Sequence, residues 1–103
     1  MTKREERDLQ DARIFASLWA LAHFDTDDPT AENIADGAGV EGTKVFYTPQ
    51  QATASLKRLA KKGLTFEEEE RIKSGRHNQR AYNLTTLGFG IGTAVEAACS
   101  DNS

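Results

Sequence analysis

One stretch of the sequence, residues 48–64 (TPQQATASLKRLAKKGL), constrains the fold most, because it carries signals for both ends of a single helix. Thr48 is a suitable N-cap, the proline after it suits the first helical position, and Gln51 stands where a capping box has Glu or Gln. Gly63, directly after two lysines, is typical of the residue that follows a helix C-terminus. The stretch therefore predicts a helix over about 49–62.

The predicted helix has an apolar face and a basic face. At about 100° per residue, its apolar side chains share one side: Ala52, Leu56, Leu59 and Ala60. The opposite side contains no acid and carries Gln50, Ala54, Lys57, Arg58 and Lys61, with Gln51 and Thr53 on its flanks. A basic helical face is usually a solvated surface, so this face alone assigns no function. Its meaning depends on the segments around it.

Length and composition indicate a soluble globular protein. The chain has 103 residues, 38% of them hydrophobic and 28% charged, which favours one domain over residues 1–103 with a core over about 9–98. No apolar run approaches the length of a membrane span, and the first basic residues are followed by acids, so we expect neither a membrane segment nor a signal peptide. A single cysteine, Cys99, excludes an internal disulfide and fits a reducing compartment. These features predict a cytoplasmic protein.

The charges are unevenly distributed. The net charge is -3, yet nine of the thirteen basic residues lie between Lys44 and Arg80, and nine of the sixteen acidic residues precede Gly37. Apart from Glu67–Glu70, the segment from Lys44 to Thr85 contains no acid. Because charges interact over a Debye length of about 8 Å, an acidic protein can still present a cationic face to a phosphate.

The N-terminal part of the chain predicts a long helix. Residues 9–24 are rich in apolar side chains and contain no Gly or Pro, whereas the charged residues 1–8 form a frayed arm or a first helical turn. One helical stripe consists of Leu9, Ala12, Phe15, Ala16, Trp19 and Ala22, with Ile14, Leu18 and Leu21 beside it. Two interpretations remain open: a central buried helix, or a helix that also packs against a second subunit.

A second, shorter helix precedes the basic one. Thr30 is a suitable N-cap for a helix from Ala31 to about Ala38, with its apolar residues facing inward and Gly37 or Gly39 ending it. A short helix followed by a capped basic helix is the helix-turn-helix pattern, in which the second helix enters the major groove of DNA. The seven residues 41–47 make the turn longer than usual, and Val45, Phe46 and Tyr47 either fill a gap in the core or form a short extended piece.

The segment after Gly63 predicts a β-hairpin. Residues 64–73 and 80–85 show period-2 patterns around a polar tip at 74–79. The distal part of the hairpin is basic through Arg71, Lys73, Arg76, His77 and Arg80. A last helix is expected from Leu87 to about Cys99, after a cap at Thr85-Thr86. Three alternate glycines weaken this helix by about 1 kcal/mol each relative to Ala, which indicates close packing.

The order helix, helix, basic helix, hairpin and final helix resembles the small winged-helix regulators of the MarR, PadR and ArsR type. In these families LxxLxxxGL leads into the first wing strand, a tip with Gly and Arg follows, and RxYxLTxxG returns into the last helix. This chain matches the first motif with Leu56, Leu59, Gly63 and Leu64, the tip with Gly75, Arg76 and His77, and the return with Arg80, Tyr82, Leu84, Thr85 and Gly88. The resemblance covers about residues 9–98 and implies an α+β, mainly helical fold: a winged helix-turn-helix with a two-stranded wing and a C-terminal helix.

The resemblance also implies a function and a set of contact residues. A regulator of this type binds specific double-stranded DNA, with the basic helix in the major groove and the wing, about 65–85, on the backbone or in the minor groove. Carried over, the DNA-binding candidates are Thr48, Gln50, Gln51, Thr53, Lys57, Arg58, Lys61, Lys73, Arg76, His77 and Arg80. Gln pairs with adenine, and Lys or Arg pairs with guanine or phosphate. The acids Glu67–Glu70 depart from the pattern, and we expect some of them to turn toward Arg71, Arg80 or a partner subunit.

We also expect a homodimer formed through the N- and C-terminal helices, because the apolar face from Leu9 to Phe24 is broad and the helix from Leu87 to Cys99 is lined with glycines. Two alternative functions remain: a plasmid or phage partition protein that coats repeated DNA sites with the same fold, or a winged helix used only for protein contacts. An enzyme is not expected, because His23 and His77 have no Ser or Cys placed to form a triad. No cofactor or metal is expected, because one Cys and two distant His give no ligand spacing.

Overall fold

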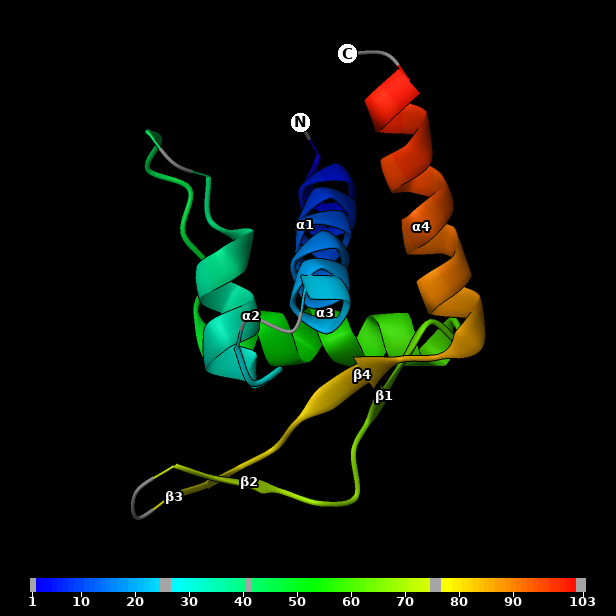
Figure 1. Cartoon of the computed structure of the whole chain (residues 1–103). Coiled ribbons are helices and arrows are strands. Elements are labelled where there is room, and N and C mark those ends of the chain that lie inside the picture. The colour runs from blue at the N-terminus through cyan, green and yellow to red at the C-terminus, as the bar shows by residue number, and fades with distance from the viewer. Residues whose placement is uncertain (1, 25–26, 41, 75–76, 102–103) are drawn as a thin grey trace.

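The computed structural model describes residues 2–24, 27–40, 42–74 and 77–101. Its elements, in order, are α1 (Lys3–Phe24), α2 (Ala31–Ala38), α3 (Pro49–Lys61), β1 (Thr65–Glu67), β2 (Ile72–Ser74), β3 (His77–Gln79), β4 (Tyr82–Leu84) and α4 (Thr86–Asp101). Helix α3 crosses beneath α1 and α2, the strands extend from the far side of α3, and α4 rises beside α1 (Figure 1). This arrangement confirms the predicted fold class, a mainly helical winged helix-turn-helix with a C-terminal helix.

Both predicted caps of α3 are present. The Thr48 hydroxyl oxygen accepts a hydrogen bond from the Gln51 backbone N–H at 3.1 Å, and the Thr48 backbone N–H donates to Gln51 Oε1 at 2.8 Å. At the other end, the N–H of Leu64 bonds to the carbonyl of Leu59 and the N–H of Gly63 bonds to that of Ala60. This pair of bonds requires the positive φ of 77° at Gly63, which glycine adopts without strain.

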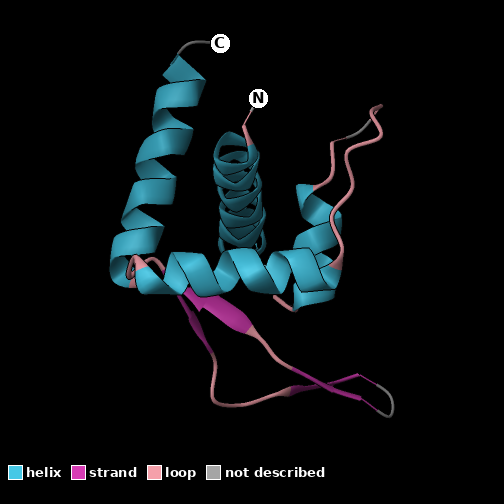
Figure 2. Cartoon of the chain, turned by 180° about the vertical axis from the view of Figure 1, so that it is seen from behind, coloured by secondary structure: helices cyan, strands magenta, loops and turns pink. Residues whose placement is uncertain are grey.

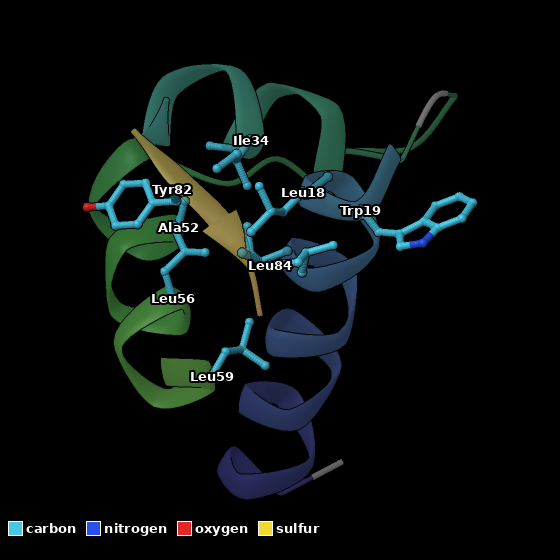
Figure 3. Packing of buried hydrophobic residues seen from close by; sticks show 11 residues of the cluster. Leu18, Trp19, Ile34, Ala52, Leu56, Leu59, Tyr82 and Leu84 are labelled. Carbon is cyan, nitrogen blue, oxygen red and sulfur yellow. The ribbon is translucent and has the colours of Figure 1, made fainter. Parts of the chain in front are cut away.

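The hydrophobic core lies where α1, α2 and α3 meet β4. Leu18 of α1, Ile34 of α2 and Leu56 of α3 point toward one another, and Leu84 of β4 covers them from the wing side (Figure 3). Among these four, none is more than 7% exposed. Burying one such aliphatic side chain stabilises the fold by about 1.5 to 3 kcal/mol, so this cluster holds α3 in place.

The apolar stripes described for α1 and α3 enter the core only in part. On α1, Leu9 is 38% exposed, and the neighbouring line through Ile14 and Leu18 is fully buried. Helix α1 is apolar on two sides, and the core is built on the side that faces α2 and α3. On α3, Ala60 is exposed and Ser55 is buried, because the Ser55 hydroxyl accepts a hydrogen bond from Gln10 of α1 at 2.9 Å.

Helix α2 has the predicted limits and the predicted cap, since Thr30 accepts a hydrogen bond from the backbone N–H of Asn33 at 3.3 Å. The longer turn that follows contains no helix or strand in its described part, residues 42–47. Only Tyr47 packs against the core, and its hydroxyl accepts a hydrogen bond from Arg13 of α1 at 3.0 Å. Phe46 is 76% exposed, so the turn fills the core through one side chain.

The wing is a hairpin made of two separate strand pairs. Strand β1 pairs with β4 in the register Thr65↔Leu84, and β2 pairs with β3 in the register Ile72↔Gln79. Four residues separate β1 from β2, whereas two separate β3 from β4, so the acids after β1 lie in a bulged interruption. The base of the wing is anchored by a hydrogen bond from the backbone N–H of Tyr82 to the carbonyl of Pro29 at 2.9 Å.

Helix α4 begins at the predicted cap. The Thr85 hydroxyl accepts a hydrogen bond from the Gly88 backbone N–H at 3.0 Å and donates to the carbonyl of Gly63 at 2.6 Å. A Cβ atom at Gly88 would collide with the Leu64 carbonyl, and one at Gly92 would fall on the indole ring of Trp19. The predicted close packing is therefore confirmed at these two glycines, whereas Gly90 has open space around its Cα.

Candidate nucleic-acid interface

Helix α3 lies across one side of the molecule, with the wing beneath it and α1 behind it (Figure 2). Ala52, Leu56 and Leu59 are buried, which turns the opposite side outward. Gln50, Lys57 and Lys61 are all exposed, and their side chains make no hydrogen bond or ion pair with any described residue. With Ala54 between them, they form an outer face of about three turns without an acid, which we call the outer face of α3.

The predicted contact residues of the first turn have local structural roles as well. Thr48 and Gln51 form the capping box, which holds both side chains at the N-terminus of α3. The Thr53 hydroxyl donates to the carbonyl of Pro49 at 2.9 Å, and its side chain is half-buried on the flank of α3 that faces the wing. Gln50 is thus the first-turn side chain that projects from the helix without an internal partner among the described residues.

Arg58 lies elsewhere than the sequence indicated. Its Nε and Nη2 atoms donate to both carboxylate oxygens of Asp11 on α1, with distances of 2.7 to 3.1 Å. Burial of the Asp11 carboxyl raises its pKa, but the hydrogen bonds from Arg58 and Ser55 lower it by more, so this pKa lies below its usual value of 3.8. At 100° per residue, Arg58 stands 80° from Gln50, on the flank toward α1. Its main partner is therefore an acid inside the protein.

The wing places its predicted contact residues in different surroundings. Lys73 is exposed in β2, and His77 occupies β3, whereas Gly75 and Arg76 of the tip lie outside the described residues. Arg80 forms an exposed ion pair with Glu67, with 3.1 Å between Nε and Oε1. An exposed pair of this kind contributes little, about 0 to 1 kcal/mol, so Arg80 can exchange it for a phosphate. A groove of about 410 Å³ separates this part of the wing from Thr53.

The acids of the wing are only partly neutralised. The expected turn of an acid toward Arg80 is confirmed for Glu67. Glu68 accepts a hydrogen bond from Asn83 at 3.0 Å. Glu69 and Glu70 are exposed in the interruption between β1 and β2, and neither forms an ion pair within the described part of the chain.

A second exposed surface combines α1 and α4. An apolar groove of about 220 Å³ runs between them and is lined by Ala12, Phe15, Ala16, Trp19, Ile91, Gly92, Val95 and Glu96. Beside this groove α4 exposes large apolar side chains, including Leu87 at 57% and Val95 at 56%. The Trp19 Nε1 atom is buried without a hydrogen-bond partner in the described structure.

The sequence predictions missed a set of basic residues outside α3 and the wing. Arg4 and Arg7 of α1 and Lys62 after α3 line a groove of about 530 Å³ together with Arg58 and Lys61. The mixed charges of residues 3–8 hid this set, because only the helical spacing shows that the arginines share one side. The groove lies beside the outer face of α3.

Comparison with known proteins supports the fold. No protein-family model and no curated protein sequence matches the chain. Among solved structures, AF1382 from Archaeoglobus fulgidus aligns with a TM-score of 0.63 and 14% identity, covering 100% of this chain and 92% of that one. A point mutant of MepR from a multidrug-resistant S. aureus clinical isolate aligns with a TM-score of 0.55 and 17% identity, covering 96% of this chain and 72% of that one. At such low identities, the two similarities show the fold alone.

The described residues offer no other obvious site. They contain no group of three or more His, Cys, Asp and Glu side chains arranged to hold a metal ion. Within the same part of the chain, no helix has both the length and the apolar character that crossing a membrane requires. The outer face of α3, the wing, the α1–α4 groove and the basic groove are thus the surfaces that need a functional explanation.

Proposed function

We propose that the protein is a sequence-specific, double-stranded DNA-binding transcriptional regulator of the MarR, PadR or ArsR type. The observation that carries the proposal is the outer face of α3, the second helix of a helix-turn-helix, where Gln50, Lys57 and Lys61 project without a partner among the described residues. A major groove about 12 Å wide admits one α-helix, and Gln and Lys are suited to base edges and phosphates.

The wing has a supporting role in this proposal. Lys73 and Arg80 are exposed cations on flexible stems, so they contact phosphates and add affinity with little sequence preference. Arg76 and His77 of the tip are expected to act in the same way. The acids Glu69 and Glu70 would repel phosphates, and their place in the bulge lets the wing approach the duplex by its tip.

The proposal includes a homodimer formed through α1 and α4. The exposed apolar side chains of α4 and the groove beside Trp19 give a surface that a second copy of the chain would cover. A twofold dimer would set two α3 helices about 34 Å apart, one helical turn of DNA, on a palindromic site. A DNA-binding protein in a reducing compartment would be located in the cytoplasm, and we propose this location for the protein.

The test is a titration of labelled duplexes from the region flanking the protein's own gene, measured by fluorescence anisotropy at several salt concentrations. Gln50→Ala should weaken binding to the preferred site by about 1 to 3 kcal/mol and relax the preference at one base pair. Lys61→Ala should weaken binding to all duplexes alike and lower the slope of log affinity against log salt by about one unit. Lys44→Ala removes a cation from the turn before α3 and serves as the control.

A second candidate function is protein binding without DNA, favoured by the exposed carboxylates of Glu69 and Glu70, which have no ion-pair partner among the described residues, and by the exposed ring of Phe46. If Gln50→Ala, Lys57→Ala and Lys61→Ala all bind duplexes as the parent does, α3 lies outside the DNA interface and this candidate takes first place. A DNase footprint distinguishes the regulator from a partition protein, because a protein that coats repeated sites protects a much longer stretch.

A further inference from the structure

The basic groove lies between the N-terminal part of α1 and the C-terminal end of α3. Five basic and two acidic residues line its volume of about 530 Å³, in a chain whose net charge is -3. We propose that this groove binds phosphates of the DNA backbone, on the side of the major groove that faces away from the wing. This inference rests on the proposed function of α3 and adds Arg4, Arg7 and Lys62 to the interface.

The groove arises because α1 is longer than α3. Helix α1 has 22 residues, or about 33 Å, and α3 has 13 residues, or about 20 Å. The side of α1 that reaches α3 through Asp11 continues toward the N-terminus at positions i-4 and i-7, which are Arg7 and Arg4. Glu5 and Glu6 of the same turns do not line the groove. Helical spacing therefore separates the arginines from Glu5 and Glu6, whereas Asp8 stays in the lining.

The groove keeps a positive charge after its internal pairs are counted. Asp11 is paired with both donor atoms of Arg58, so its charge is compensated, and Asp8 is the other acid of the lining. Arg4, Arg7, Lys61 and Lys62 are exposed, and within the described structure none of them forms an ion pair or a side-chain hydrogen bond. Gathering these cations costs electrostatic repulsion unless an anion occupies the space between them.

The cations are not required to complete the end of α3. The backbone N–H groups of Lys62, Gly63 and Leu64 already bond to carbonyls of the last turn. Lys61 and Lys62 interact favourably with the helix dipole, but a contribution of about 0.3 to 1 kcal/mol per charge does not explain two further arginines from another helix. A bound anion does explain them, since Arg recognises phosphate oxygens with two parallel hydrogen bonds.

The position of the groove indicates which phosphates of the duplex it would contact. One flank of α3, at Thr53, faces the wing, and the other flank, at Arg58, faces α1. When a helix fills the major groove, the two backbones of the DNA pass along its two flanks. The wing can reach one backbone, and the groove with Arg4 and Arg7 borders the other. The duplex would then be held from both sides of α3.

The test compares two duplexes of the same sequence and length, using the full chain. In the second duplex, methylphosphonate linkages neutralise the phosphates that border the major groove on the α1 side of the footprint. Arg7→Gln should lower the salt slope by about one unit on the natural duplex and leave it unchanged on the neutralised one. Arg4→Gln should behave in the same way and serves as an independent second variant. Glu6→Gln, a charge change in the same turn outside the groove, should leave both slopes as in the parent.

Two results would overturn the inference. The groove would lie outside the interface if Arg4→Gln and Arg7→Gln bound both duplexes as the parent does. It would be a site for free phosphate alone if inorganic phosphate shifted the NMR signals of α1 while the natural duplex showed no slope change in either variant. Lys57→Ala tests α3 in the same assay. If this variant bound the natural duplex as the parent does, the proposed function of α3 would fail, and this result is distinct from a failure of the groove.

Discussion

Helix α1 contacts α3 on one side and α4 on the other, and the two contacts differ in how complete they are. Toward α3, Ile14 and Leu18 are fully buried, and the buried Asp11 carboxylate forms an ion pair across the interface with the half-buried Arg58. Toward α4, a groove remains open, and Val95 stays more than half exposed. The first interface satisfies its apolar and polar groups within one chain, whereas the second leaves apolar surface in water.

The difference fits the proposed function, in which one chain carries both a DNA-binding helix and a surface for association. The α1–α3 contact fixes the outer face of α3 relative to α1 and the wing, as the proposed DNA recognition would require. The α1–α4 contact is made by Gly92 against Trp19, which positions α4 but covers only part of it. A second copy of the chain would cover the exposed apolar side of α4, as α3 covers the side of α1 that faces it.

The largest effect on stability is expected from Leu56→Ala, which opens a cavity on the α1–α3 side. Leu56 is 1% exposed, so its truncation should lower the free energy of unfolding by about 2 to 5 kcal/mol. Urea unfolding at a fixed protein concentration measures the change. Ala60 belongs to the predicted apolar stripe but is exposed, so Ala60→Ser should lower the free energy of unfolding by no more than about 0.5 kcal/mol. A loss at Ala60 equal to that at Leu56 would contradict the observed face of α3.

The sequence predicted this interface in part. The limits and caps of α3 were found because their signals lie within a few residues of each other, from Thr48 to Gly63. The partner of Arg58 was missed because Asp11 is 47 residues away, and no local pattern connects them. The buried Ser55 was missed for the same reason, since its burial depends on a hydrogen bond from α1.

Other features could not be predicted because their sequence patterns are compatible with two different structures. Helix α1 is apolar on two sides, and which side enters the core depends on where α2, α3 and α4 pack. The interruption of the wing after Glu67 depends on the pairing of two strand segments, which the period-2 pattern does not specify, because a shift of two residues preserves it. The motif predicts a tip that lies partly outside the described residues, and the basic groove could not be predicted because it needs two helices placed side by side.

The second effect concerns the α1–α4 side and compares two glycines of one helix. Gly92→Ala places a methyl group on the Trp19 ring, so it should destabilise the protein by about 1 to 3 kcal/mol. Gly90→Ala meets open space and should stabilise the helix by up to about 1 kcal/mol. Trp19 is the single tryptophan, so its fluorescence should change in the first variant and not in the second. Equal effects of the two variants would show that α4 does not pack on α1 through Gly92.

A smaller effect is expected from Asp11→Asn, which removes the charge from the α1–α3 ion pair. Arg58 can still reach water through the basic groove, so the loss at neutral pH should be about 1 to 2 kcal/mol. Because the pKa of Asp11 in the folded protein lies below 3.8, its contribution is present above that pH and is lost as the pH falls through the folded pKa. The free energy of unfolding should therefore fall less steeply for the variant than for the parent between neutral and acidic pH. The same pH dependence in both proteins would contradict the role of the pair.

The smallest effect on the stability of the single chain is expected from Val95→Glu, and this variant tests the α1–α4 comparison most directly. Val95 is 56% exposed beside the groove, so a charged side chain there reaches water and should change the unfolding free energy of a monomer by less than about 0.5 kcal/mol. In a dimer the same carboxylate would be buried without a partner, which is costly, so light scattering at micromolar concentration should show a dimer for the parent and a monomer for the variant. Ala97→Glu adds the same charge two residues later, about 200° around the helix and away from the groove, and should remain dimeric. A parent that is monomeric at high micromolar concentration, with and without DNA, would mean that the exposed side of α4 has another use and that a single copy of α3 must read its site.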